Sequence, residues 1–152
     1  CAYQSNFYEP KIMWSNMAQI GQFALVPSGN FCNDSAFLIT GQELEYLCGM
    51  LNSMLSAWYV QTSGYTTSFG VPQWKKFIVQ EVPVACPAEN VKESIKQFVN
   101  QIVESDYEIY QPHFIKEIEE LTFEIYDLNA QEKSFLKTKF QKSGASFLSC
   151  KR

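Results

Sequence analysis

Short hydrophobic runs separated by turn-forming residues dominate the first third of the chain. The runs lie at 11–14, 23–26 and 36–39, and the segment 27–30 reads Pro-Ser-Gly-Asn. Runs this short, with proline, glycine and asparagine between them, are typical of antiparallel strands joined by turns. We therefore predict a small, mainly antiparallel sheet.

A helical period replaces this pattern after residue 40. Thr40-Gly41-Gln42-Glu43 has the form of a capping box, in which the Thr40 hydroxyl accepts the backbone N–H near Glu43 and the Glu43 carboxylate reaches back. Apolar residues then recur at helical spacing: Leu44, Leu47, Met50, Leu51, Met54, Leu55 and Trp58. The pattern predicts one long helix over 42–58, apolar over a wide face and buried against the sheet.

Two further segments complete the first 86 residues. Residues 60–73 are mostly polar, which predicts a loop long enough to be either functional or disordered. Residues 74–84 contain two short apolar runs, around Ile78 and Val82, and predict a closing strand.

The remainder of the chain has a helical pattern. Apolar residues recur there at 4-3-4 spacing in two sets: Val91, Ile95, Phe98 and Ile102, then Phe114, Ile118, Leu121 and Ile125. We predict two helices with coiled-coil-like seams, the second starting at Pro112, and a third helix capped by 129–132. The fold class is therefore α+β: a small sheet with one long buried helix over 1–86, a helical extension over 87–142 and a basic tail over 143–152.

Charge is distributed unevenly along the chain. Its formal net charge is −4, yet residues 104–132 hold nine acidic and one basic residue, and residues 133–152 hold six basic residues and no acid. Two windows, 10–33 and 46–80, contain no carboxylate but many amide, hydroxyl and tyrosine side chains. Such side chains bind phosphates or base edges in DNA complexes. Ordinary polar loops are the alternative explanation.

Residues that carry chemistry are scarce. His113 is the only histidine and lies at a predicted helix start, so we expect a surface or capping role and no nucleophilic catalysis. There is no glycine-rich phosphate loop. Glu117, Glu120 and Glu124 share one helix face, but no histidine supports a metal there. We predict no catalytic residue, no metal and no cofactor in this chain.

The environment of the protein is also constrained. The five cysteines are widely spaced without a CxxC pair, as expected for reduced thiols in a cytoplasmic protein. No run approaches the roughly 18 apolar residues of a membrane helix. Because the first residue is Cys1 and no leader pattern follows, we expect a piece of a longer protein.

Several stretches together resemble the TaqI-like C-terminal specificity domain, the target-recognition part of adenine-specific DNA methyltransferases and of fused restriction-methylation enzymes. They are Tyr8-Glu9-Pro10-Lys11-Ile12, the strands around Phe23 and Phe37, residues 46–53 with Leu51-Asn52-Ser53, Trp58-Tyr59, Trp74-Lys75-Lys76-Phe77, Val82-Pro83-Val84 and residues 118–128. The resemblance implies double-stranded DNA as a partner and an upstream methyltransferase domain. That domain would bind S-adenosylmethionine, and the parent protein would methylate adenine, with or without an endonuclease activity.

The resemblance also suggests where DNA would bind. The loops 15–22 and 61–73 would face the major groove, and lysines beside them would hold phosphates. The phosphate candidates are Lys11, Lys75 and Lys76, the base-edge candidates are Asn16, Gln19, Gln22, Thr66, Thr67 and Gln73, and Tyr65 is a candidate for a thymine methyl or a sugar. The alternative is a spacer module of a separate specificity subunit, whose 4-3-4 helices pack on another protein.

Overall fold

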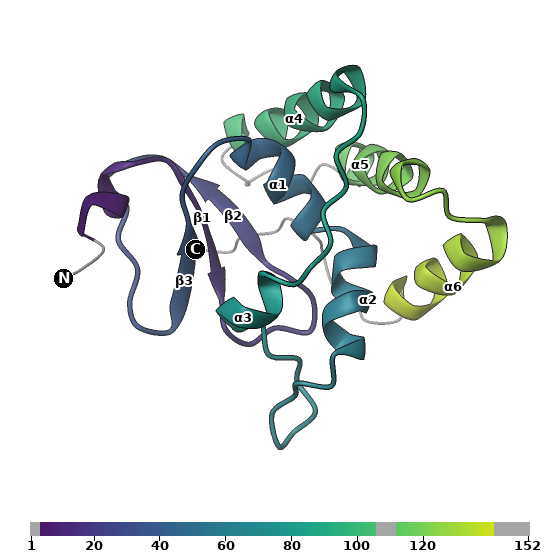
Figure 1. The fold of residues 1–152 in the computed structure, drawn as a ribbon, viewed down its shortest axis with the longest axis horizontal. Coiled ribbons are helices and arrows are strands. Elements are labelled where there is room, and N and C mark those ends of the chain that lie inside the picture. Colours follow the sequence, from purple (N-terminus) through teal and green to yellow (C-terminus); the bar gives the residue numbers. More distant parts are fainter. Residues whose placement is uncertain (1–3, 106–111, 142–152) are drawn as a thin grey trace.

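A three-stranded antiparallel sheet forms one side of the molecule. The computed structural model describes residues 4–105 and 112–141, and the sheet contains β1 (Lys11–Ser15), β2 (Phe23–Val26) and β3 (Ala36–Ile39) in the order β2-β1-β3 (Figure 1). A short 3-10 helix, η1 (Gln4–Tyr8), precedes β1. On the central strand, Trp14 lies opposite Phe23 on one side and Phe37 on the other. The three strands predicted before residue 40 and the α+β class are confirmed.

The predicted long helix is instead two helices, α1 (Leu44–Leu51) and α2 (Met54–Thr62). Asn52 ends the first helix because its side chain binds the backbone of β2: the amide oxygen accepts from Phe23 N at 3.1 Å and the amide nitrogen donates to Phe23 O at 2.8 Å. Ser53 then caps α2, its hydroxyl accepting from Ser56 N at 3.2 Å. The predicted continuous helix is therefore wrong: the tertiary bonds of Asn52 to β2 and the local capping bond of Ser53 interrupt it.

The predicted capping box before α1 is also wrong. Glu43 occupies the N-cap position with a left-handed φ of 56° and makes no capping bond. Its carboxylate lies 3.4 Å from the Lys96 ammonium, while the Thr40 hydroxyl accepts from the Asn6 amide at 3.1 Å. Both side chains thus bind neighbouring elements of the fold, so neither caps the first turn of α1.

The predicted closing strand is wrong as well, because α3 (Lys76–Val79) and an extended segment take its place. Two tyrosines hold that segment. Tyr46 donates its hydroxyl to Ala85 O at 2.8 Å, and Tyr126 donates to Pro83 O at 2.5 Å and accepts from Ala85 N at 3.0 Å. Pro83 has no backbone N–H for a strand ladder, so hydroxyl groups satisfy this backbone instead.

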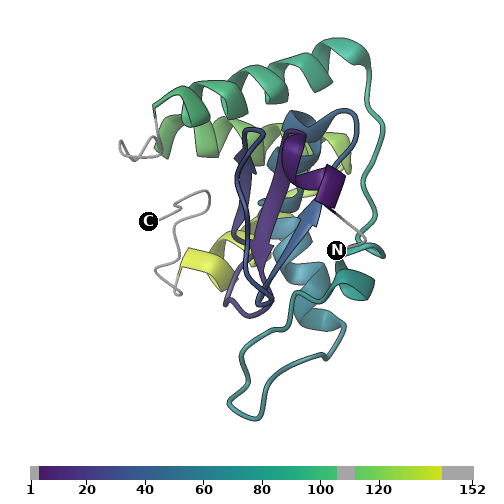
Figure 2. The ribbon, with the colours of Figure 1, turned by 90° about the vertical axis from the view of Figure 1, so that its left-hand side faces the viewer.

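The three predicted C-terminal helices are confirmed as α4 (Glu89–Glu104), α5 (Pro112–Ile125) and α6 (Ala130–Gln141). Asn129 caps α6 as predicted: its side-chain oxygen accepts from Glu132 N at 3.0 Å. In turn, the Glu132 carboxylate accepts from Asn129 N at 2.8 Å. Figures 1 and 2 show these helices on the side of α1 and α2 that faces away from the sheet.

One continuous core joins the sheet to all of these helices. Its members include Phe23 on β2, Leu51 on α1, Ile95 on α4, Phe123 on α5 and Leu136 on α6, each at most 3% exposed. The sheet and the C-terminal helices therefore stabilise each other through α1 and α2.

Candidate nucleic-acid interface

Two loops that are distant in the sequence meet at one end of the molecule. The Trp74 backbone N–H donates to Asn16 O at 2.7 Å, and Gln73 forms an antiparallel bridge with the first loop. Figure 1 shows the second loop projecting from the body between α2 and α3. We call residues 16–22 and 63–76 the paired-loop surface. The structure thus brings together the two loops that we predicted to read DNA.

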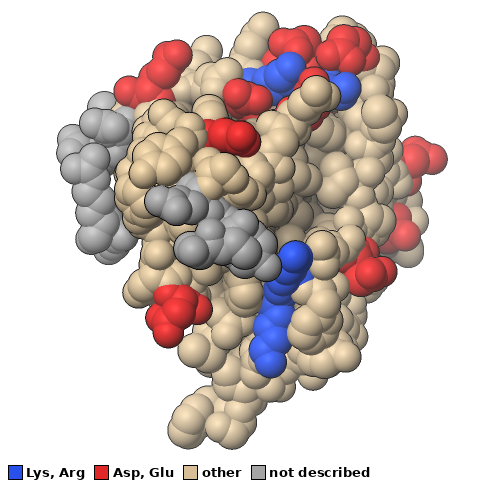
Figure 3. Space-filling model, turned by 60° about the vertical axis from the view of Figure 1, so that its left-hand side comes forward, with Lys and Arg blue, Asp and Glu red and all other residues tan. Residues whose placement is uncertain are grey.

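The paired-loop surface differs from the rest of the molecule in charge. Its two segments lie within the acid-free windows, and Lys75 and Lys76 are its charged residues. In Figure 3 acidic side chains lie at the top, along the right-hand side and at the lower left, and the projecting loop at the bottom shows none. The projecting loop itself therefore carries no carboxylate that would repel phosphates.

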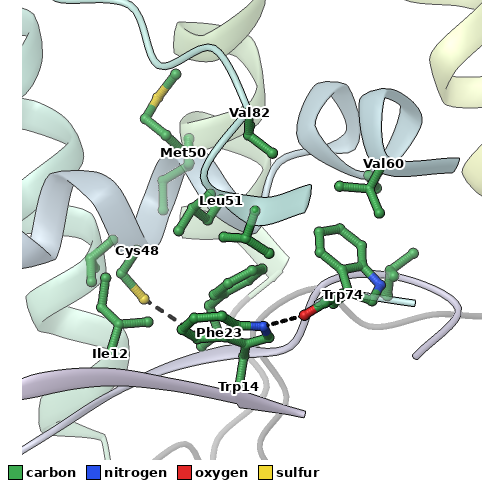
Figure 4. Close-up of a cluster of buried hydrophobic side chains, with 14 of the residues drawn as sticks. Ile12, Trp14, Phe23, Cys48, Met50, Leu51, Val60, Trp74 and Val82 are labelled. Atoms are coloured by element: carbon green, nitrogen blue, oxygen red, sulfur yellow. Dashed lines mark hydrogen bonds between the residues drawn. The ribbon is translucent and has the colours of Figure 1, made fainter. Parts of the chain in front are cut away.

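Two buried indoles fix the base of the paired-loop surface (Figure 4). The Trp14 indole N–H donates to Trp74 O at 2.7 Å, and the Trp74 indole N–H donates to Ala18 O at 3.0 Å. Gly21 allows this close packing, because a Cβ there would lie 2.7 Å from the Phe23 ring and 3.0 Å from that of Trp74. The loops consequently leave the core from a rigid base.

The projecting loop is itself an ordered hairpin. Thr66 and Pro72 form a bridge, Thr67 N donates to Val71 O at 2.8 Å, and Gly70 N donates to Thr67 O at 2.9 Å. Gly70 has a φ of 75°, which places it in the left-handed region after a tight turn. This combination is a common three-residue hairpin connection, and it requires glycine at the left-handed position.

The structure places most of the predicted DNA-binding residues on this surface. The exposed ones are Gln19, Gln22, Tyr65, Thr66 and Lys76, and the half-buried ones are Asn16, Thr67, Gln73 and Lys75. The Gln73 amide donates to Thr66 O at 3.2 Å, and the Gln61 amide ties α2 to Gln19 O at 3.0 Å. Main-chain and side-chain bonds therefore hold the two loops in a defined relation to each other.

Lys11 does not belong to the paired-loop surface. Its side chain is wholly buried beside β2, and its ammonium donates to Pro27 O at 3.3 Å. The predicted phosphate contact requires an exposed ammonium, so we correct that expectation: Lys11 binds the turn after β2 instead.

A comparison with protein families finds a match for this chain. A family model described as the TaqI-like C-terminal specificity domain matches residues 2–84, more than half of the chain. The chain belongs to this family. The match covers the sheet, α1, α2, α3 and the whole paired-loop surface. A comparison with curated proteins finds no match.

The resemblance seen in the sequence is thereby confirmed over residues 2–84, the stretch 118–128 lies outside the match, and the chain is a specificity domain of the restriction-modification type. Among residues 4–105 and 112–141, the structure contains no group of three histidine, cysteine or acidic side chains placed to hold a metal ion. Over the same ranges, each helix is too short or too polar to cross a membrane.

Exposed hydrophobic side chains on the specificity domain escaped the sequence analysis. Phe69 at the hairpin tip is 92% exposed, and Met17 is 56% exposed. Tyr65 and Phe77 pack edge to face with ring centroids 5.3 Å apart, which supports the hairpin from the side. A phenylalanine between Ser68 and Gly70 in a polar loop was the available signal, because no sheet or helix pattern accounts for it.

Proposed function

We propose that this specificity domain reads a base sequence in double-stranded DNA through the paired-loop surface. The observation that carries the proposal is the convergence of two acid-free loops on one rigidly based surface, with Trp74 N bound to Asn16 O. Sequence is read by amides, hydroxyls and apolar groups at base edges, whereas cations on phosphates set register. The paired-loop surface offers both kinds of group side by side.

Each group has a role that follows from its place. Lys75 and Lys76 lie at the base of the hairpin and would hold phosphates, each as a salt-sensitive contact. The hairpin is a narrow two-stranded ribbon, a shape that fits the major groove, which is about 12 Å wide. Within the groove the base-edge candidates are Asn16, Gln19, Gln22, Thr66, Thr67 and Gln73, with Tyr65 on a thymine methyl or a sugar.

The parent protein that we propose is an adenine-specific DNA methyltransferase of the cytoplasm, with or without endonuclease activity. Its methyltransferase domain would precede this chain and would bind S-adenosylmethionine. We expect the chain alone neither to bind the cofactor nor to methylate DNA. Titration calorimetry with S-adenosylmethionine tests this, and micromolar binding would contradict it.

A spacer module that packs on another subunit is a weaker proposal. It needs the 4-3-4 seams of α4 and α5 as a free surface, but Ile95, Ile102 and Ile118 are at most 4% exposed. Phe98 and Phe114 stack on each other with centroids 5.7 Å apart. These seams are occupied within the domain, which favours DNA recognition.

A selection experiment tests the proposed function. The whole chain is incubated at low salt with duplexes that carry about 20 randomised base pairs, and bound DNA is amplified and sequenced over several rounds. We expect one enriched motif. A variant whose hairpin, 66–72, is replaced by a Gly/Ser loop should lose that motif.

The control replaces residues 29–33, a connector between β2 and β3 that lies outside the paired-loop surface, and should enrich the parental motif. If the hairpin variant still selects the same motif, the hairpin is not the reader. If the parental chain enriches nothing and binds no duplex, the proposed function is wrong.

A further inference from the structure

Phe69 is the most exposed large hydrophobic side chain in the described parts of the chain, with 92% of its surface in contact with solvent. It stands at the third position of the four-residue turn 67–70, which the bond from Gly70 N to Thr67 O closes at 2.9 Å. An exposed phenylalanine forgoes the stabilisation that burial of its ring would give, which is roughly 1.5–3 kcal/mol. The position is therefore one where an apolar contact with a partner would recover that stabilisation.

The residues around Phe69 restrict the chemistry of this partner. Its neighbours Thr67 and Ser68 are uncharged hydroxyl residues, and no carboxylate occurs between residues 46 and 80. Lys75 and Lys76 follow at the foot of the same hairpin. An apolar tip between hydroxyls, backed by two lysines, suits a groove that is lined by polar edges and flanked by phosphates.

The major groove offers one apolar group to such a tip, the C5-methyl group of thymine, and phenylalanine is among the side chains that contact it. We infer that Phe69 is a specificity-determining residue that packs on a thymine methyl in the recognised site. This inference rests on the proposed function, because it requires the hairpin to enter the major groove. It adds direct reading of an A·T pair at the hairpin tip to the amide and hydroxyl contacts proposed above.

Deoxyuridine substitution tests this contact, since it removes only the methyl group. The duplex is the motif selected by the whole chain, and each thymine in either strand is replaced in turn. Dissociation constants are measured by fluorescence anisotropy. For the parental chain, one or two replacements should weaken binding about four-fold, the factor that corresponds to burial of one methyl group. The other replacements should have no effect.

Variants at the tip complete the experiment. Phe69→Ala should bind the thymine and deoxyuridine duplexes equally, and Phe69→Leu should retain a preference for thymine. The matched control is Phe31→Ala, which removes another exposed ring, 62% in contact with solvent, between β2 and β3. The control should keep the parental sensitivity to deoxyuridine. Circular dichroism and a melting curve confirm that each variant is folded.

Several outcomes would overturn the inference. Binding of the parental chain that no deoxyuridine weakens excludes methyl reading, as does a selected motif without A·T pairs. A deoxyuridine penalty that persists in Phe69→Ala assigns the methyl contact to another residue. In each of these cases the chain still binds its motif, so the proposed function stands. A chain that binds no duplex overturns both proposals at once.

Discussion

The helical side of this specificity domain and its paired-loop surface are built on opposite principles. Along α4, α5 and α6 most apolar residues are buried or half-buried, with Phe135 as an exposed one, and residues 104–132 hold nine acids. On the paired-loop surface the rings of Tyr65 and Phe69 face solvent, and carboxylates are absent. The first arrangement maximises stability and solubility, and the second leaves side chains free for a partner. Substitutions in the two regions should therefore affect different properties of the protein.

A carboxylate buried within the helical side departs from this contrast. Glu119 on α5 is 5% exposed; its Oε1 accepts from Met54 N at 2.8 Å, and its Oε2 has no partner among the described residues. Burial raises the pKa of Glu119 to about 8, and the Glu120 carboxylate adds to the increase while Lys137 opposes it. The bond from Met54 N to Glu119 thus joins α5 to the first residue of α2, directly after the break between α1 and α2.

Truncation of a buried leucine should have the largest effect on stability. Leu51 is 2% exposed at the end of α1, and Leu51→Ala should lower the free energy of unfolding by about 2–5 kcal/mol, the usual range for buried leucine. Phe69→Ala in the hairpin should change it by less than about 0.5 kcal/mol, as exposed positions do. Urea unfolding followed by circular dichroism measures both. A Leu51→Ala midpoint equal to that of the parent would show that the core does not depend on this residue.

Substitution of Glu119 should change how stability depends on pH. The ordinary pKa is 4.5 and the folded one about 8. Well below pH 4.5 the Glu119 carboxyl is protonated in both the folded and the unfolded protein. As the pH rises toward 8, the unfolded chain loses this proton first, so the free energy of unfolding falls. Above pH 8 the decrease in stability is complete. Glu119→Gln mimics the protonated form and should remove this loss, which amounts to at most about 5 kcal/mol because each pKa unit is worth about 1.4 kcal/mol.

The measurement compares the variant with the parent at pH 5 and at pH 8.5. The gain in stability should be larger at pH 8.5, and any constant cost of the unpaired amide cancels in the difference. Glu124→Gln on the exposed face of α5 is the control and should leave the pH dependence unchanged. Equal pH dependence in Glu119→Gln and parent would mean that Glu119 is ionised in the folded protein.

Two glycines allow the same substitution to be made in each region. A Cβ on Gly49 would lie 2.7 Å from a methyl carbon of Ile95 and 3.2 Å from one of Val99, so Gly49→Val should lower the free energy of unfolding by about 2–3 kcal/mol through overpacking. Gly70 has a φ of 75°, and a Cβ on it would meet no atom within 4 Å. A substituted side chain there would therefore strain only the backbone of a surface turn. Gly70→Val should cost about 1–2 kcal/mol through the left-handed backbone and should also weaken DNA binding. Melting curves measure the loss of stability, and fluorescence anisotropy measures the loss of DNA affinity. Weakened DNA binding by a folded Gly49→Val variant would contradict the assignment of DNA binding to the paired-loop surface alone.

Periodicity in the sequence predicted those elements whose apolar residues follow one pattern from end to end. The strands around Trp14, Phe23 and Phe37 and the helices α4 and α5 are of this kind, whereas α6 was predicted from its cap at Asn129. The break at Asn52 was not predictable from periodicity, because the apolar spacing continues through it while the side chain binds β2, which is a tertiary contact. The same reason explains why Glu43 failed to form its capping box: Lys96 on α4 attracts it instead.

The two loops of the paired-loop surface were predicted from the acid-free windows together with the family resemblance. Acid-free windows identified both loops, but only the fold shows that Trp74 joins them at Asn16. Composition also could not distinguish an exposed lysine from a buried one, which is why Lys11 was included wrongly. Phe69 was overlooked because a hydrophobic residue is by default expected in the core, and its exposure depends on the turn at Gly70.

The smallest expected effects concern single contacts of the paired-loop surface with DNA, and they should be of two kinds. A lysine on a phosphate contributes equally to every sequence and releases a counterion. Lys75→Ala or Lys76→Ala should therefore weaken all duplexes alike and lower the slope of log affinity against log salt by about one unit. A base-edge contact discriminates by roughly 1–3 kcal/mol without a charge, so Thr67→Ala should relax the preference at one position and leave the slope unchanged.

Anisotropy titrations from low to moderate salt, on the selected motif and on a scrambled duplex, distinguish these two kinds. Lys116→Ala is a matched control, because Lys116 is an exposed lysine on the acidic helix α5, away from the paired-loop surface. It should change neither the affinity nor the slope. Lysine variants that lower affinity for the motif alone would place Lys75 and Lys76 on bases, and the hairpin would then read DNA from its foot as well as from its tip. A slope that changes as much in Lys116→Ala would mean that the whole molecule, and not the paired-loop surface, carries the electrostatic contact.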